Sequence, residues 1–149
     1  MIKLTPKNPN ALPKMHEDME DAISLGIKQG MQKIGMHLTA IIKKDITKRS
    51  KGSVKGMRYN PNRKVKISPS GTSPNNDTGA LRSSILWQLM GNDDEVLVGT
   101  TLNYGRFLED GTRKMGARPY IKNNAESETE KMAEILTESI RKQLDRIGR

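Results

Sequence analysis

The spacing of apolar residues near the start of the chain constrains its fold more than any other feature. Between residues 14 and 47 they recur at steps of three and four, which places them on one face of an α-helix. The stripe consists of Met15, Met19, Ala22, Ile23, Ile27, Met31, Ile34, Leu38, Ile41 and Ile42. The pattern predicts one long amphipathic helix, preceded by an extended, proline-containing arm at residues 1–13.

Three glycines interrupt the predicted helix. Gly26, Gly30 and Gly35 each cost about 1 kcal/mol relative to alanine inside a helix. Their presence indicates either a bend or close packing against another backbone. The charged residues around them exclude a membrane dimerisation motif.

A second long helix is expected at the end of the chain. Pro119 suits the first turn of a helix, and apolar residues with a 3.6-residue period follow it. They are Tyr120, Ala125, Met132, Ile135, Leu136, Ile140, Leu144 and Ile147. The remaining predicted elements lie between these two helices in the sequence.

The segment between the helices reads as a small antiparallel sheet. Residues 84–90 and 95–100 alternate as strands do, and the acidic turn between them predicts a hairpin. Asp77 and Thr78 can cap a short helical turn before it. We therefore expect a single α+β domain over residues 1–149, with a small antiparallel sheet flanked by the long N-terminal and C-terminal amphipathic helices.

Glycines punctuate the segment that follows the hairpin. Gly99 is expected to end the second strand, and residues 104–110 are long enough for a small helix. Gly111 stands where a left-handed C-terminal cap belongs. Gly99 and Gly111 would let the chain reverse at the hairpin end and after the small helix.

Few large apolar residues are available to the core. Only 34% of the 149 residues are hydrophobic, with one Trp and one Phe, so the core must be aliphatic, methionine-rich and thin. A chain of this length forms one modest core. A thin core suggests that neighbouring subunits help to complete it.

A dense cluster of positive charge lies between residues 43 and 66. Ten basic residues stand there against one acidic residue, Asp45, which accounts for the whole net charge of +9. The basic residues are Lys43, Lys44, Lys48, Arg49, Lys51, Lys55, Arg58, Arg63, Lys64 and Lys66. Residues 48–77 predict a long, protruding, hairpin-like basic loop. The cluster can approach phosphate or an acidic protein face, and a solvated loop explains it equally well.

The residue types that carry catalysis are scarce. His16 and His37 are the only histidines, and they lie about 30 Å apart on one predicted helix, too far to share a catalytic site in one subunit. The absence of cysteine excludes disulfides and thiolate chemistry, and residues 92–95 lack the ligand spacing of a calcium loop. We expect no enzymatic activity, no cofactor and no metal. No signal peptide or membrane span is indicated.

Four short motifs occur in order in the middle of the chain. They are SPSGTSP at residues 68–74, DTGALRSSI at 77–85, the stretch from VGT to YGRFLEDGT at 98–112, and KMGARPYI at 114–121. In this order and spacing they resemble the minor tail component or tail-completion family of long-tailed bacteriophages, over about residues 56–125. Gly105 replaces a more usual alanine, Asp110 a small or apolar residue, and Tyr120 a phenylalanine.

The resemblance implies a non-enzymatic structural protein of the virion neck or tail, made in the bacterial host cytoplasm. Such proteins assemble as a ring, usually of six copies, that completes the tail or joins it to the head. The implied partners are other copies of the chain and the neighbouring head-tail connector, tail terminator or tail tube proteins. No membrane partner is implied.

The same segment supplies the expected interface. The residues are Tyr104, Phe107, Glu109, Gly111, Thr112, Met115, Arg118 and Pro119. Arg118 can make forked hydrogen bonds to a carboxylate or to carbonyls, with Glu109 as candidate partner within the subunit or across a ring interface. Pro119 would fix the angle at which the last helix leaves. A core role for Tyr104, Phe107, Leu108 and Met115 is the competing interpretation.

A second hypothesis comes from another functional class. A small basic protein could contact the DNA backbone through residues 43–66. In that case a monomer or dimer would suffice, and log affinity would fall steeply with log salt concentration.

Overall fold

The computed structural model describes residues 11–48, 53–57 and 60–147. Its first element, α1 (Ala11–Thr47), is a single helix of 37 residues, about 55 Å long at 1.5 Å per residue. The long helix predicted from the apolar stripe is confirmed. The extended arm predicted for residues 1–13 is wrong for residues 11–13, which already belong to α1. Pro13 lies in the first helical turn, where a backbone N–H has no helical hydrogen-bond partner and its absence does not weaken the helix. Residues 1–10 of the arm lie outside the described residues.

Two antiparallel hairpins follow α1. Strands β1 (Ser53–Met57) and β2 (Asn60–Ile67) pair across the predicted basic loop, so its hairpin character is confirmed. After α2 (Ala80–Ser84), strands β3 (Ile85–Met90) and β4 (Glu95–Thr100) pair with Leu86 opposite Gly99. This hairpin matches the predicted strands, although Gly99 lies inside β4 and reverses nothing. Two strands beside long helices confirm the α+β class.

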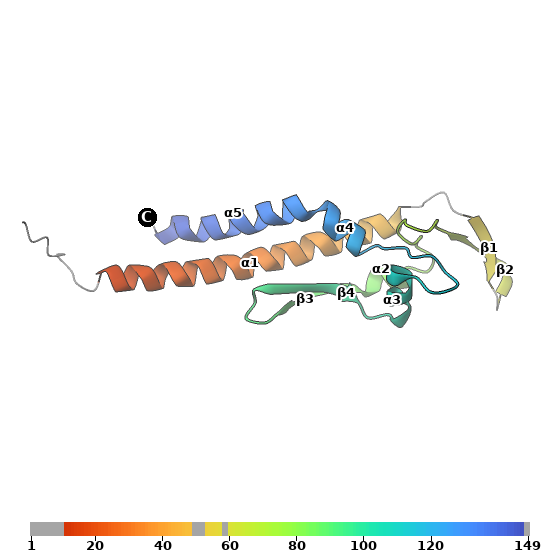
Figure 1. The fold of residues 1–149 in the computed structure, drawn as a ribbon, viewed down its shortest axis with the longest axis horizontal. Helices are drawn as coiled ribbons and strands as arrows, with labels where there is room; N and C mark the ends of the chain where they lie inside the picture. The colour runs from red at the N-terminus through yellow and green to blue at the C-terminus, as the bar shows by residue number, and fades with distance from the viewer. Residues whose placement is uncertain (1–10, 49–52, 58–59, 148–149) are drawn as a thin grey trace, which may run out of the picture.

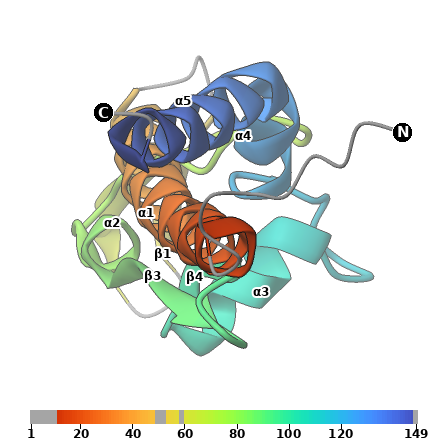
Figure 2. The same cartoon turned by 90° about the vertical axis from the view of Figure 1, so that its left-hand side faces the viewer.

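Three layers make up the body of the molecule. The long helix α1 lies between α5 (Thr129–Ile147) on one side and the β3–β4 hairpin on the other (Figures 1 and 2). The hairpin β1–β2 extends beyond the end of α1 that bears Thr47 (Figure 1). Helices α3 (Asn103–Asp110) and α4 (Lys122–Ser127) connect β4 to α5.

The glycines of α1 are sites of close packing. A Cβ on Gly26 would stand 2.7 Å from the Cα of Ile140 in α5, and one on Gly30 would stand 2.7 Å from Leu136 Cδ1. On the opposite side of α1, a Cβ on Gly35 would stand 2.7 Å from the ring of Trp87. Of the two readings that the sequence left open, close packing against another backbone is confirmed at Gly26.

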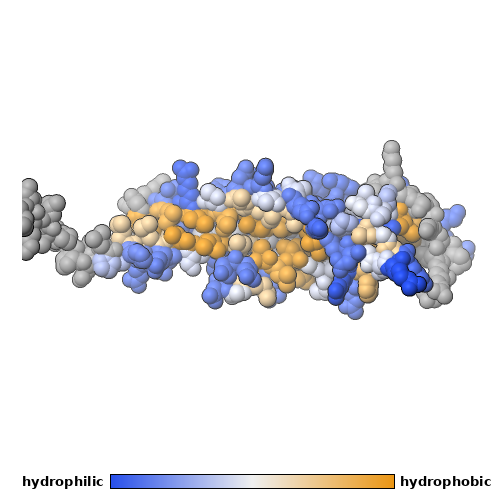
Figure 3. Space-filling view, viewed as in Figure 1, coloured by the Kyte–Doolittle hydropathy of each residue, from blue (hydrophilic) through white to orange (hydrophobic). Residues whose placement is uncertain are grey.

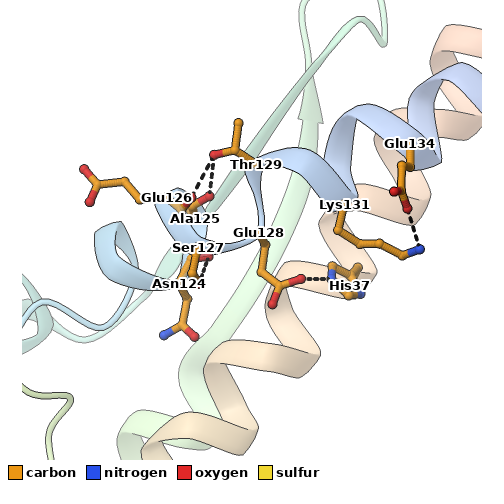
Figure 4. A network of polar contacts seen from close by, with 9 residues as sticks. All are labelled: His37, Asn124, Ala125, Glu126, Ser127, Glu128, Thr129, Lys131 and Glu134. Carbon is orange, nitrogen blue, oxygen red and sulfur yellow. Dashed lines mark hydrogen bonds and ion pairs between the residues drawn. The ribbon is translucent and has the colours of Figure 1, made fainter.

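The C-terminal helix is broken at Glu128, where one continuous helix was predicted. Glu128 has φ −103° and ψ 9°, which separates α4 from α5. Figure 4 shows that hydroxyl groups on both sides of the break donate to backbone carbonyls of α4. The Ser127 hydroxyl donates to the Asn124 carbonyl over 3.0 Å, and Thr129 donates to the Ala125 and Glu126 carbonyls. Hydroxyls of this kind compete with helical hydrogen bonding.

The buried core is small and lies near the end of α1 that bears Thr47. The cluster consists of Ile42, Ile46, Leu81, Ile85 and Tyr120. Among the described residues, large hydrophobic side chains are more often exposed than buried. Figure 3 shows hydrophobic side chains in a band along the long axis, over α1 and the elements beside it. None of the described helices has the length and apolar character of a membrane span.

Candidate assembly interface

Residues of all four motifs line one cavity. Its volume is about 340 Å³, and its walls come from β2, the loop before α2, α2 itself, α3 and the loop before α4. Each motif contributes to it, through Ser68, Leu81, Leu108 and Met115 respectively. The fold therefore gathers the family-like residues into a single surface feature, which the motif order alone did not predict.

Arg118 holds two loops together at the wall of this cavity. Its Nε donates to the Ser68 carbonyl over 2.9 Å, and one terminal nitrogen donates to the Gly116 carbonyl over 3.2 Å. Of the predicted acceptors, carbonyls are therefore the ones used. Pairing with Glu109 within the subunit was wrong, because that carboxylate is occupied elsewhere.

Glu109 caps the start of α4. Its carboxylate accepts the backbone N–H groups of Tyr120, Ile121 and Lys122 over 2.9, 3.1 and 2.8 Å. Helix N-termini carry N–H groups without intrahelical partners, and an anion there is stabilised by the helix dipole. No local sequence pattern indicates this contact, because Glu109 lies more than ten residues before the helix that it caps.

Pro119 and Gly111 play roles that differ from those predicted. Pro119 precedes Ile121, the N-cap of α4, so it lies outside the first helical turn. Gly111 ends α3 with φ 76° and ψ −177°, which is a glycine-only conformation outside the predicted left-handed helical region. A Cβ there would stand 2.7 Å from the Ala117 nitrogen. After it, Thr112 and Met115 exchange backbone hydrogen bonds and close a tight turn.

The aromatic residues of α3 are exposed. Tyr104 and Phe107 expose 44% and 54% of their surface, so neither is a core residue of this subunit. Met115 is half-buried in the cavity wall. The interpretation of the two aromatic side chains as core residues is therefore wrong. Both remain available to a partner.

The comparison with family models bears on what this surface serves. A model described as "Bacteriophage HK97-gp10, putative tail-component" matches residues 11–111. The chain belongs to this family of phage tail components. The match takes in all of α1 and ends at Gly111, so Arg118 lies beyond it. No curated protein and no solved structure matches the chain.

The family assignment places this tail component in the virion, in contact with other virion proteins. The first and second motifs fall wholly within the matched residues, and the third extends one residue beyond them. The cavity lining therefore combines residues of the family match with Met115 and Arg118 from outside it.

Tyr120 belongs to the buried core of the tail component. Its place in the fourth motif did not indicate this role. It is fully buried, and its hydroxyl has no hydrogen-bond partner in the described structure. Burial, with the nearby charge of Glu109 and Tyr104, raises the pKa of Tyr120 to about 12. A Cβ on Gly105 would stand 2.8 Å from this hydroxyl and would also strike Thr100 Cγ2.

The basic residues of the tail component are only partly described. Arg49, Lys51 and Arg58 lie outside the described residues, as do the side chains of Lys55 and Arg63. Lys44, Lys48, Lys64 and Lys66 are exposed. Lys43, Lys44 and Lys48 line a hollow of about 580 Å³ with Arg82 of α2. The sequence missed Arg82 as a member of this group, because only the packing of α2 beside α1 brings it there.

Asp45 links three distant segments of the tail component. Its Oδ2 accepts hydrogen bonds from Ser73 and, over 3.1 Å, from Asn124, while Lys48 Nζ lies 3.6 Å from Oδ1. Desolvation raises the pKa of Asp45, but the hydrogen bonds from Ser73 and Asn124 and the charge of Lys48 outweigh it, so the pKa lies below its usual value.

Proposed function

We propose that this tail component is a structural subunit of the phage neck that assembles as a ring, with six copies as the expected number. The ring completes the tail or joins it to the head, beside head-tail connector, tail terminator or tail tube proteins. The observation that carries the proposal is the exposed apolar surface. Eleven large hydrophobic side chains of the described residues are exposed, against eight buried hydrophobic residues. Such surfaces in a soluble chain mark interaction sites.

The outer face of the β3–β4 hairpin belongs to this surface. Leu86, Met90 and Leu97 are exposed there, whereas Trp87 and Val96 turn toward α1. The exposed Tyr104 and Phe107 continue the apolar surface on α3. In this proposal the eight predicted interface residues have two roles. Glu109, Gly111, Arg118 and Pro119 shape the loops, and these loops present the aromatic side chains to the partner.

Deleting the gene from its phage tests the proposal. Filled heads and unjoined tails, seen separately in negative-stain images, are the expected result. The proposal also expects rings, or tail tubes capped at one end, when the purified chain is mixed with tubes. Normal virions from the deletion strain would overturn it.

A second candidate function is contact with the DNA backbone. The hollow lined by Lys43, Lys44, Lys48 and Arg82 favours it, because four cations gather where a phosphate could approach. Fluorescence anisotropy with duplex DNA between about 50 and 200 mM salt is the test. Replacing Lys44 and Lys48 by Gln should reduce the log–log salt slope by about 2, one per lost phosphate contact. An unchanged slope would contradict this candidate.

A further inference from the structure

The helix α1 extends beyond the helix that packs against it. Gly26 lies opposite Ile140, and an equal step outward from both residues reaches Met19 on α1 and Ile147, the last residue of α5. Figure 1 shows the first turns of α1 projecting past the end of α5. Residues before Met19 therefore lack α5 as a packing partner within this subunit.

An apolar row begins on this projecting segment and continues onto the part of α1 that lies beside α5. Met15, Met19 and Ile23 are spaced by four, so they lie on one helix face, and they expose 53%, 40% and 38% of their surface. Four acidic residues stand among them against one lysine, Lys14. The acidic residues are Glu17, Asp18, Glu20 and Asp21, all exposed. The segment is an acidic helix with apolar anchors.

The cavity offers the complementary surface. Much of its lining is apolar, with Leu81, Leu108 and Met115 among its walls. Lys66 and Arg118 also line it, Lys64 lies close by, and Asp77 is its one acidic lining residue. Positive charge is therefore in excess around an apolar hollow.

An unused polar group lies in the wall of the same cavity. The Ser68 side chain is 3% exposed, and its hydroxyl has no hydrogen-bond partner in the described part of the chain. An unpaired buried hydroxyl is unfavourable.

We propose that the Met15–Ile23 segment of one copy docks its apolar row over this cavity of the next copy. The apolar anchors enter the hollow, as in helix-in-groove recognition, while Glu17 and Glu20 approach Lys64 and Lys66. The inference rests on the proposed ring and names the contact that would build it.

The occupant is a second copy because one chain carries both complementary surfaces at opposite ends. The projecting turns of α1 lie at one end of the molecule, whereas α2, α3 and β2 lie toward the other (Figure 1). One copy therefore cannot satisfy its own cavity. Contacts between unlike surfaces repeat from copy to copy and close into a ring when the rotation allows.

Cross-linking in the assembled particle tests the docking directly. The chain has no cysteine, so Met19→Cys with Met115→Cys introduces the only two thiols. A short bis-maleimide added to virions should give a ladder of covalent oligomers. Met36→Cys with Met115→Cys is the matched control, since Met36 is also an exposed methionine of α1, and it should give no ladder.

The outcomes separate the docking from the ring. A ladder in both variants, or in neither, from particles that contain the chain would overturn the docking and leave the proposed function standing. Particles that lack the wild-type chain altogether would overturn the proposed function.

A charge swap gives an independent readout. Glu17→Lys with Glu20→Lys, and separately Lys64→Glu with Lys66→Glu, should each weaken self-association about tenfold or more by placing like charges together. An equal mixture of the two variants should restore assembly in analytical ultracentrifugation, because every contact is again between opposite charges. Undiminished assembly of each variant alone would contradict the docking. Reversal of Arg141 and Lys142 on α5 serves as the control.

Discussion

At the scale of single residues, the structure explains two departures from the family pattern together. The Tyr120 hydroxyl occupies space that a methyl group on residue 105 would need. Glycine at 105 therefore avoids a contact with the hydroxyl of Tyr120, as well as a closer one with Thr100 Cγ2. The two substitutions are one packing solution, and the buried unpaired hydroxyl is its cost.

This packing predicts a coupling between the two positions. The variant with both Gly105→Ala and Tyr120→Phe should be more stable than the sum of the single variants by about 1 kcal/mol, because Tyr120→Phe removes one of the two contacts that the methyl would make. Thr100 meets that methyl in both backgrounds, so its effect cancels. Urea denaturation of the four proteins measures the coupling, and a value near zero would contradict the explanation.

The raised pKa of Tyr120 predicts an alkaline loss of stability. The folded state holds the phenolic proton up to about pH 12, whereas an unfolded tyrosine loses it near pH 10. The contribution is fully present below pH 10 and disappears as the pH rises toward 12, by on the order of 2 kcal/mol. Urea denaturation between pH 9 and pH 12 should show a smaller decline for Tyr120→Phe than for wild type. Parallel declines would contradict the shift.

At the scale of elements, close approach of helices replaces a large core. Gly26 and Gly30 let α5 pack directly against the α1 backbone. Farther along, the His37 imidazole and the Glu128 carboxylate, 2.7 Å apart, join α1 to the break between α4 and α5 (Figure 4). Few side chains are buried between these elements. Close backbone contacts and polar contacts such as that of His37 with Glu128 therefore hold them together.

Gly26→Ala should destabilise the chain by about 1–3 kcal/mol. Its Cβ would stand 2.7 Å from Ile140 Cα, and a backbone atom cannot rotate away as a side chain can. This outweighs the gain of about 1 kcal/mol in helix propensity. Exposed Ser24→Ala on the same helix is the control and should be neutral or stabilising. The urea midpoints decide, and a Gly26→Ala protein as stable as the control would refute the packing.

Glu109→Ala should cost about 1–3 kcal/mol by leaving three N–H groups at the start of α4 without their acceptor. Glu109→Gln keeps one acceptor oxygen and should lose less. Asp110→Ala removes only an exposed ion pair with Arg106 and should change stability by less than about 0.5 kcal/mol. Thermal unfolding compares the three, and equal losses at 109 and 110 would exclude the cap.

At the scale of the whole molecule, the subunit is long, layered and incompletely packed. Its buried cluster occupies one end, while apolar residues stay exposed on α1, β3, β4 and α3. A single polar group, Asp45, ties α1 to the loop before α2 and to α4. This carboxylate is therefore one of the groups that hold the segments at this end together.

Asp45→Asn should therefore lower stability by about 2 kcal/mol at neutral pH. Because its folded pKa is depressed, the wild-type contribution is present above the unfolded value near 3.9 and is lost as the pH falls through the folded pKa. The two proteins should differ at pH 7 and converge at strongly acidic pH. A difference that does not depend on pH would contradict the role of the charge.

The sequence by itself determined the elements that follow from local periodicity. The apolar stripe of α1 and the alternation in β3 and β4 depend on neighbours in the chain, so α1 and the hairpin were predicted closely. The four motifs likewise identified the family from their order. Such local patterns can be recognised without knowing how the elements pack.

Only the tertiary structure decided which of these elements meet, and thereby what the motif residues do. Glu109 caps a helix that begins beyond Pro119, Arg118 binds carbonyls, and Arg82 joins the lysines of α1. The break at Glu128 depends on side-chain hydrogen bonds that a 3.6-residue period does not reveal. These contacts join residues far apart in sequence, and their energies depend on distances that exist only after folding.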